Sequence, residues 1–86
     1  MNQDDALREA KLVGGLCRFE VRIHAIERMA SRGVSRSDIA NALKTATVAL
    51  YQEDGCWRFE GGVDEEKDPL IVVARFTQKC VIITIF

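Results

Sequence analysis

The chain has few of the residues from which metal sites and disulfide frameworks are built. It contains one histidine and three cysteines among 86 residues. Cys17, Cys56 and Cys80 are an odd number and include no C-x-x-C pair, so neither a zinc knuckle nor a redox motif is indicated. The spacing gives no support to a zinc site made from these cysteines and His24. We therefore expect no metal and no other cofactor.

Long apolar runs are missing as well. No segment approaches the roughly 18 to 20 apolar residues that cross a bilayer. The first residues, Met-Asn-Gln-Asp-Asp, lack the basic and apolar regions of a signal peptide. We therefore expect a cytoplasmic protein. Hydrophobic residues make up 48 % of the sequence, which is enough for the core of one domain over residues 1–86. A chain of this length is too short for two domains.

Helical patterns dominate the first half of the chain. Residues 4–13 carry apolar side chains near helical spacing, and Gly14-Gly15 is expected to end this helix. Residues 17–23 alternate between apolar and charged side chains, which predicts a half-buried strand. A second helix is expected over residues 24–31. A third follows Ser35, which has the acidic residue three positions later that is typical of a capping box.

Strand patterns dominate the second half. Residues 47–51 and 56–60 flank Asp54-Gly55, a strong tight-turn pair, and predict a hairpin. The apolar segments 70–76 and 80–86 predict central strands. Either a central position or pairing with a second copy in a homodimer would cover the last strand. The order predicts an α+β fold, with N-terminal helices packed on a mostly antiparallel sheet of four to five strands.

The near-neutral net charge of -1 conceals a polarised chain. Residues 18–36 contain five arginines and two acids, a local charge of +3, whereas residues 52–68 have a local charge of -5. The planar guanidinium of arginine suits phosphate and carboxylate groups, so the arginine-rich segment indicates an anion site. A solvated face balanced by nearby acids is the alternative. The five arginines are Arg18, Arg22, Arg28, Arg32 and Arg36.

His24 is the only histidine, and arginines lie near it in the sequence. It is the one candidate for proton exchange near neutral pH through an ordinary side chain. Arg22 precedes it by two residues, and Arg28 follows it by one helical turn. This set of residues suits cleavage of RNA by its own ribose 2′-hydroxyl, which needs proton transfer and cations but no metal. A packing or capping histidine is the alternative.

Residues 28–44 also resemble a DNA-reading helix-turn-helix. Gly33 would form the turn and Ser35 the cap of the second helix. Such motifs usually have a small residue four positions before the glycine, where this chain has the bulky Met29. The second helix offers few side chains for reading bases in the groove. A helix-turn-helix-like DNA-binding regulator is therefore an alternative function and not the first.

The segment HAIERMASRGVSRSDIANAL, an Arg-Phe-Glu-Gly hairpin and the closing VIITIF together resemble the small bacterial domain-of-unknown-function family 4258. Members carry a His-Ala-x-x-Arg-Met-x-x-Arg-Gly-Ile/Val block. The resemblance covers residues 16–86 and leaves a helix at residues 1–15 outside it. Arg22 departs from the pattern, because members often carry threonine or serine at that position.

The layout of this family is similar to that of RelE/BrnT-type ribonuclease toxins. The likeness implies a toxin-type, metal-independent RNA endonuclease, or a degenerate relative of one, with RNA as substrate and an antitoxin protein as partner. A non-catalytic protein-interaction module is the alternative. The catalytic residues that the likeness to these toxins implies are His24, Arg28, Arg32 and Thr84. The RNA and phosphate-binding residues we expect are Arg18, Arg22 and Arg36.

Overall fold

Three helices pack against one five-stranded sheet in the computed structural model, which describes residues 1–86. In chain order the elements are α1 (Gln3–Leu16), β1 (Glu20–Val21), α2 (Ile23–Arg32), α3 (Arg36–Thr45), β2 (Val48–Tyr51), β3 (Cys56–Glu60), β4 (Val72–Phe76) and β5 (Cys80–Ile85). The strand order is β1-β5-β4-β3-β2, and only the β1–β5 pair is parallel. The expected α+β fold with a mostly antiparallel sheet is confirmed. None of the helices is both long and apolar enough to span a membrane.

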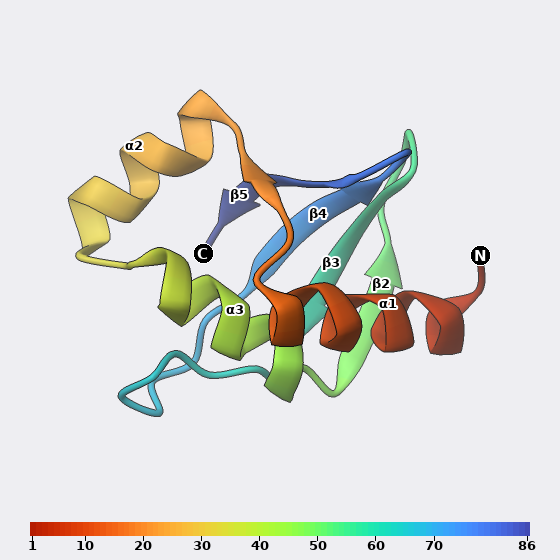
Figure 1. The fold of residues 1–86 in the computed structure, drawn as a ribbon, viewed down its shortest axis with the longest axis horizontal. Helices are drawn as coiled ribbons and strands as arrows, with labels where there is room; N and C mark the ends of the chain where they lie inside the picture. Colours follow the sequence, from red (N-terminus) through yellow and green to blue (C-terminus); the bar gives the residue numbers. More distant parts are fainter.

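The core lies between one face of the sheet and the helices. Figure 1 shows α1 and α3 crossing in front of the sheet, with α2 to one side, next to β5. Alternation along β3 turns Trp57 and Phe59 toward the helices, where both are buried. Ile39 and Leu43 of α3 are fully buried in the same core, and burial of each such side chain contributes about 1.5–3 kcal/mol. The predicted hairpin at Asp54-Gly55 is also confirmed.

The opposite face of the sheet carries arginines. Arg58 of β3 pairs with Val73 of β4, and Cys56 pairs with Arg75. These residues alternate with the core residues of the same strands, so they point away from α1 and α3. Both arginines are half-buried. We call this surface the open face.

The predicted strand over residues 17–23 is mostly wrong. Only Glu20 and Val21 pair with β5. Cys17 is exposed, with a left-handed backbone (φ 53°) that ends α1. Ile23 is the first residue of α2. The apolar and charged side chains alternate through these positions, but Cys17 caps the end of α1 and α2 begins before the segment ends.

Gly14-Gly15 does not end α1, which continues to Leu16. Gly14 is buried where α1 crosses α3, and a Cβ placed there would lie 2.7 Å from the Ala40 carbonyl oxygen. A Cβ on Gly15 would meet nothing within 4 Å. Gly14 therefore permits a close helix crossing, and the glycine pair was misinterpreted as a stop.

Alanine at the two glycines should have opposite effects. Gly15→Ala should stabilise the protein by about 0.5–1 kcal/mol, because alanine is the better helix former and has free space. Gly14→Ala gains the same helix propensity, but its Cβ would force the backbones of α1 and α3 apart. This variant should destabilise the protein by about 1–3 kcal/mol. Urea denaturation of both variants tests this. Equal effects would contradict a close crossing at Gly14.

The start of α3 is fixed by a capping box that also holds the acidic loop. The Ser35 hydroxyl accepts from the Asp38 N–H at 3.1 Å, and the Asp38 carboxylate accepts from the Ser35 N–H at 2.9 Å. The other Asp38 oxygen accepts from the Glu65 N–H at 3.0 Å. These bonds, that of the Ser35 N–H first, lower the pKa of Asp38 below its ordinary value. Asp38 therefore joins the helix to the loop in its ionised form.

Asp38→Ala should lower the free energy of unfolding by about 1 kcal/mol at neutral pH, as loss of a capping partner does. Because folding lowers this pKa, the contribution is present above the pKa of the unfolded carboxyl and disappears as pH falls through the folded pKa. The gap between wild type and variant should therefore close in acid. Urea melts at neutral and acidic pH measure it. Asp68→Ala is the control, because Asp68 lies in the same loop but its carboxylate accepts no hydrogen bond.

Candidate functional site

A shallow hollow of about 540 Å³ lies between the start of α2 and the sheet. Its lining combines cationic, titratable and apolar side chains. The lining residues are Arg22, Ile23, His24, Arg75 and Ile83. It therefore brings together two residues expected from the sequence, Arg22 and His24, and an arginine that was not expected.

The path of the chain from β1 into α2 positions Arg22 and His24. β1 runs beside the first half of β5, and the Arg22 N–H continues this pairing by donating to the Ile82 carbonyl at 3.0 Å. At the next residue the chain turns into α2. Arg22 has an extended backbone and provides no side-chain cap for the helix. The first turn of α2, at the positive end of the helix dipole, therefore begins without a side-chain cap.

A β-bulge in β5 brings Ile83 to the hollow. Val73 pairs with Thr84 and Ala74 pairs with Ile82, so Ile83 is the extra residue without a partner. The bulge changes the alternation, and Ile82 and Ile85 both face the core as a result. Bulges of this kind often redirect side chains beside functional sites.

Arg75 lines the hollow but was not predicted from the sequence as a site residue. It lies on the open face of β4, and its Nε is buried without a hydrogen-bond partner. A buried unpaired guanidinium nitrogen is costly, so an acceptor brought by a ligand would stabilise it. The one available signal was a single charge inside the apolar run LIVVARF.

The hollow is electrostatically suited to an anion. Two guanidinium groups and an imidazole line it, and none of its lining residues is acidic. The neighbouring Glu20 accepts from Lys79 Nζ at 2.7 Å, so a cation already balances its charge. Arginine donors favour phosphate or carboxylate ligands. A phosphate here would lie beside the only histidine of the chain.

Arg28 and Arg32 follow His24 along α2 but have different surroundings. Arg28 Nε donates to the Ile85 carbonyl at 2.8 Å, and its guanidinium carbon lies 5.0 Å from the centre of the Phe86 ring. Arg32 is exposed and makes no hydrogen bond or ion pair. Neither lines the hollow. Arg28 therefore anchors the end of β5 to α2, whereas the Arg32 side chain is exposed to solvent and has no partner in the chain.

The two arginines should separate in a stability measurement. Arg28→Ala removes a charge-assisted hydrogen bond and a cation–π contact, and should lower the free energy of unfolding by about 1.5–3 kcal/mol. Arg32→Ala should change it by less than about 0.5 kcal/mol. Thermal and urea denaturation test both variants. Equal stability of the two would contradict an anchoring role for Arg28.

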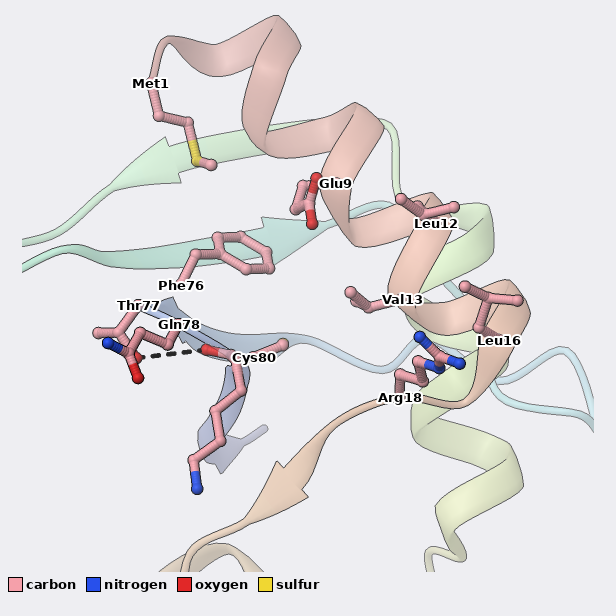
Figure 2. Close-up of a pocket in the computed structure, with 11 residues that line it drawn as sticks. Met1, Glu9, Leu12, Val13, Leu16, Arg18, Phe76, Thr77, Gln78 and Cys80 are labelled. Atoms are coloured by element: carbon pink, nitrogen blue, oxygen red, sulfur yellow. Dashed lines mark hydrogen bonds between the residues drawn. The ribbon is translucent and has the colours of Figure 1, made fainter.

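The remaining predicted residues lie outside the hollow. Arg36 donates to the carbonyls of Cys17 at 3.1 Å and Phe19 at 2.7 Å, and its guanidinium lies over the Phe19 ring. Thr84 is half-buried on the open face, next to Ile83. Arg18 lines a different cleft, between α1 and the β4–β5 turn, as Figure 2 shows. The predicted residues are therefore spread over several parts of the molecule, and only Arg22 and His24 line the hollow.

Three polar side chains of the helix that would read DNA are occupied by contacts within the chain. The two NH₂ hydrogen bonds of Asn41 go to the Val63 and Asp64 carbonyls, at 3.0 and 3.1 Å. Arg36 is held as described above, and Asp38 caps the helix. These contacts fasten α3 to the acidic loop and to the segment after α1.

The family model described as Domain of unknown function (DUF4258) matches residues 22–86. The chain belongs to this family, as its sequence pattern predicted. The match begins at Arg22 and includes every residue that lines the hollow. Comparisons with curated proteins and with solved structures give no match.

Proposed function

We propose that this protein is a metal-independent RNA endonuclease of the toxin type, with the hollow at the start of α2 as its active site. One observation carries the proposal: Arg22, His24 and Arg75 line a single hollow that contains no acid. Binding and cleavage of a phosphodiester need cations and a titratable group around one anion.

The scissile phosphate would sit between the two arginines. The guanidinium of Arg75, which lines the hollow, would donate to a phosphate oxygen. Arg22 and the uncapped start of α2 would approach from the other side. In this arrangement the cations stabilise the negative charge that increases on the phosphate oxygens as the attacking oxygen adds.

His24 would act as the proton acceptor. It takes the proton from the ribose 2′-hydroxyl, whose oxygen attacks the phosphorus. The bond from phosphorus to the 5′-oxygen breaks, and water protonates the departing oxygen. The products are a 2′,3′-cyclic phosphate and a free 5′-hydroxyl, so no metal or external oxidant is needed.

The apolar part of the lining favours a nucleic acid over a free phosphate. Ile23 is 75 % exposed, the largest exposed fraction among the large hydrophobic residues of the chain. It lies with Ile83 beside the cations. A nucleotide would place its base or ribose against these side chains while its phosphate meets the arginines.

The other predicted residues would have supporting roles. Arg32, free on the same helix, would contact RNA beyond the scissile phosphate. Arg28 would hold the end of β5, and Thr84, next to Ile83, would reach the substrate from the sheet. An antitoxin that covers the hollow would be the natural partner of such an enzyme, as the likeness to RelE/BrnT-type toxins drawn from the sequence implies.

Substitution of His24 tests the mechanism. His24→Ala should reduce cleavage of a fluorescent RNA by roughly 100-fold or more, the usual contribution of a general base. Its melting temperature should not change, because His24 is exposed. Products should carry 2′,3′-cyclic phosphate ends, and a 2′-deoxy substitution at the cleaved position should block the reaction. Gel and mass analysis measure both.

Arg8→Ala is the matched control for Arg22→Ala and Arg75→Ala, because Arg8 is an exposed arginine on α1, outside the hollow. Only the hollow variants should bind and cleave RNA more weakly. Wild-type protein that is inert on ribosomal, messenger and transfer RNA would exclude the enzyme. Cleavage that survives in His24→Ala would exclude this mechanism.

A further inference from the structure

Phe86 continues the sheet beyond the end of β5 and is fixed there by its backbone. Its N–H donates to the Ile71 carbonyl at 2.8 Å, and its carbonyl accepts from the Ile71 N–H at 3.1 Å. Because Ile85 faces the core, alternation turns the next side chain to the open face. The Phe86 side chain is 43 % exposed there. The open face therefore carries an aromatic ring whose position is set by strand pairing.

Two arginines from different elements lie against the Phe86 ring. The guanidinium carbon of Arg28, on α2, lies 5.0 Å from the ring centre, and that of Arg58, on β3, lies 5.2 Å from it. The Ile85 carbonyl holds Arg28, and the Glu60 carboxylate accepts from Arg58 Nε at 2.6 Å. Figure 1 shows α2 beside the end of β5, which brings Arg28 to the ring. We call Arg28, Arg58 and Phe86 the aromatic cluster.

The aromatic cluster has an excess of positive charge. Glu60 balances the charge of Arg58 through their ion pair. Arg28 makes no ion pair, and only its Nε has a hydrogen-bond partner. The two Nη groups of Arg28 have no partner in the chain, so they can donate to a phosphate. A guanidinium beside an exposed aromatic ring is the combination on which nucleotide bases stack in proteins that bind single strands.

The aromatic cluster and the hollow are arranged along one line of the open face. Arg75 lines the hollow, and Ile71, the partner of Phe86, directly precedes β4 on the same stretch of chain. The distance between these two positions is roughly 13 Å at the rise of an extended strand. Thr84 lies between them on the neighbouring strand. A single strand of a few nucleotides can therefore reach from the hollow to Phe86.

We propose that the aromatic cluster holds an unpaired base of the RNA strand whose phosphate is cleaved in the hollow. The base would stack on Phe86 and the adjacent guanidinium groups, and an Nη group of Arg28 would donate to a neighbouring phosphate. A base paired in a duplex is stacked inside the helix and cannot reach the ring, so the cluster selects single-stranded RNA. This inference rests on the proposed RNA cleavage and adds a base-binding subsite to it.

Fluorescence anisotropy of a labelled hexadeoxyadenylate tests binding without cleavage, because this strand lacks the 2′-hydroxyl. An abasic hexamer with the same phosphates is the matched probe. Phe86→Leu should weaken binding of the adenylate strand about tenfold, a typical loss for one stacked base. The same variant should bind the abasic strand as the wild type does. Phe86→Trp should bind the adenylate strand at least as tightly as the wild type.

Tyr51→Leu is the control variant, because Tyr51 is an exposed aromatic residue on β2, outside the aromatic cluster. It should leave the Kd of both strands unchanged. A DNA hairpin in which every adenine is paired is the control ligand. Its Kd should be the same for the wild type and for Phe86→Leu.

Any of three binding results would contradict the subsite. The abasic strand could bind the wild type as tightly as the adenylate strand, Phe86→Leu could bind both strands normally, or Phe86→Trp could lose as much affinity as Phe86→Leu. RNA cleavage is measured in parallel to separate this inference from the proposed function. A wild type that cleaves RNA with a KM unchanged in Phe86→Leu overturns the subsite alone. A wild type that binds the adenylate strand through Phe86 but cleaves no RNA overturns the enzyme alone.

Discussion

Coverage of both edges of β5 is the constraint on which the rest of the structure depends. The segment CVIITI is apolar on both faces, and it needs neighbours on either side. β4 pairs along one edge. On the other edge two residues of β1 pair with the first half of the strand, and α2 continues beside the second half. The strand is thereby covered within one chain.

The hollow follows directly from this arrangement. Where β1 gives way to α2, the chain changes from strand to helix in one residue, and no side chain caps the new helix. The bulge at Ile83 lies beside that junction, and Arg75 reaches it from the neighbouring strand. Arg28, one turn further along α2, fixes the distance between helix and strand through the Ile85 carbonyl. The site is therefore built by the same contacts that close the sheet.

The sequence predicted the elements with strong local signals and failed where tertiary contacts decide. The hairpin, the capping box at Ser35 and the fold class were correct because turn chemistry and order determine them. Gly14 was misinterpreted, because its role appears only when α3 crosses it. Arg75 was missed because the face of the sheet on which a strand residue lies is known only when the pairing register of the strand is known. His24 and Arg22 were correctly predicted to lie together, because they are two residues apart and both lie at the junction of β1 and α2.

The two cavities belong to different parts of the chain, and this bears on how function is divided. Every residue that lines the hollow lies within the family match, which begins at Arg22. The second cleft, between α1 and the β4–β5 turn, takes six of its eleven lining residues from residues 1–18, which precede that match. β5 contributes to both, with Cys80 at its start and Ile83 near its bulge. The chemistry proposed for the hollow is therefore assigned to the family region, whereas the cleft beside α1 is built largely outside that region.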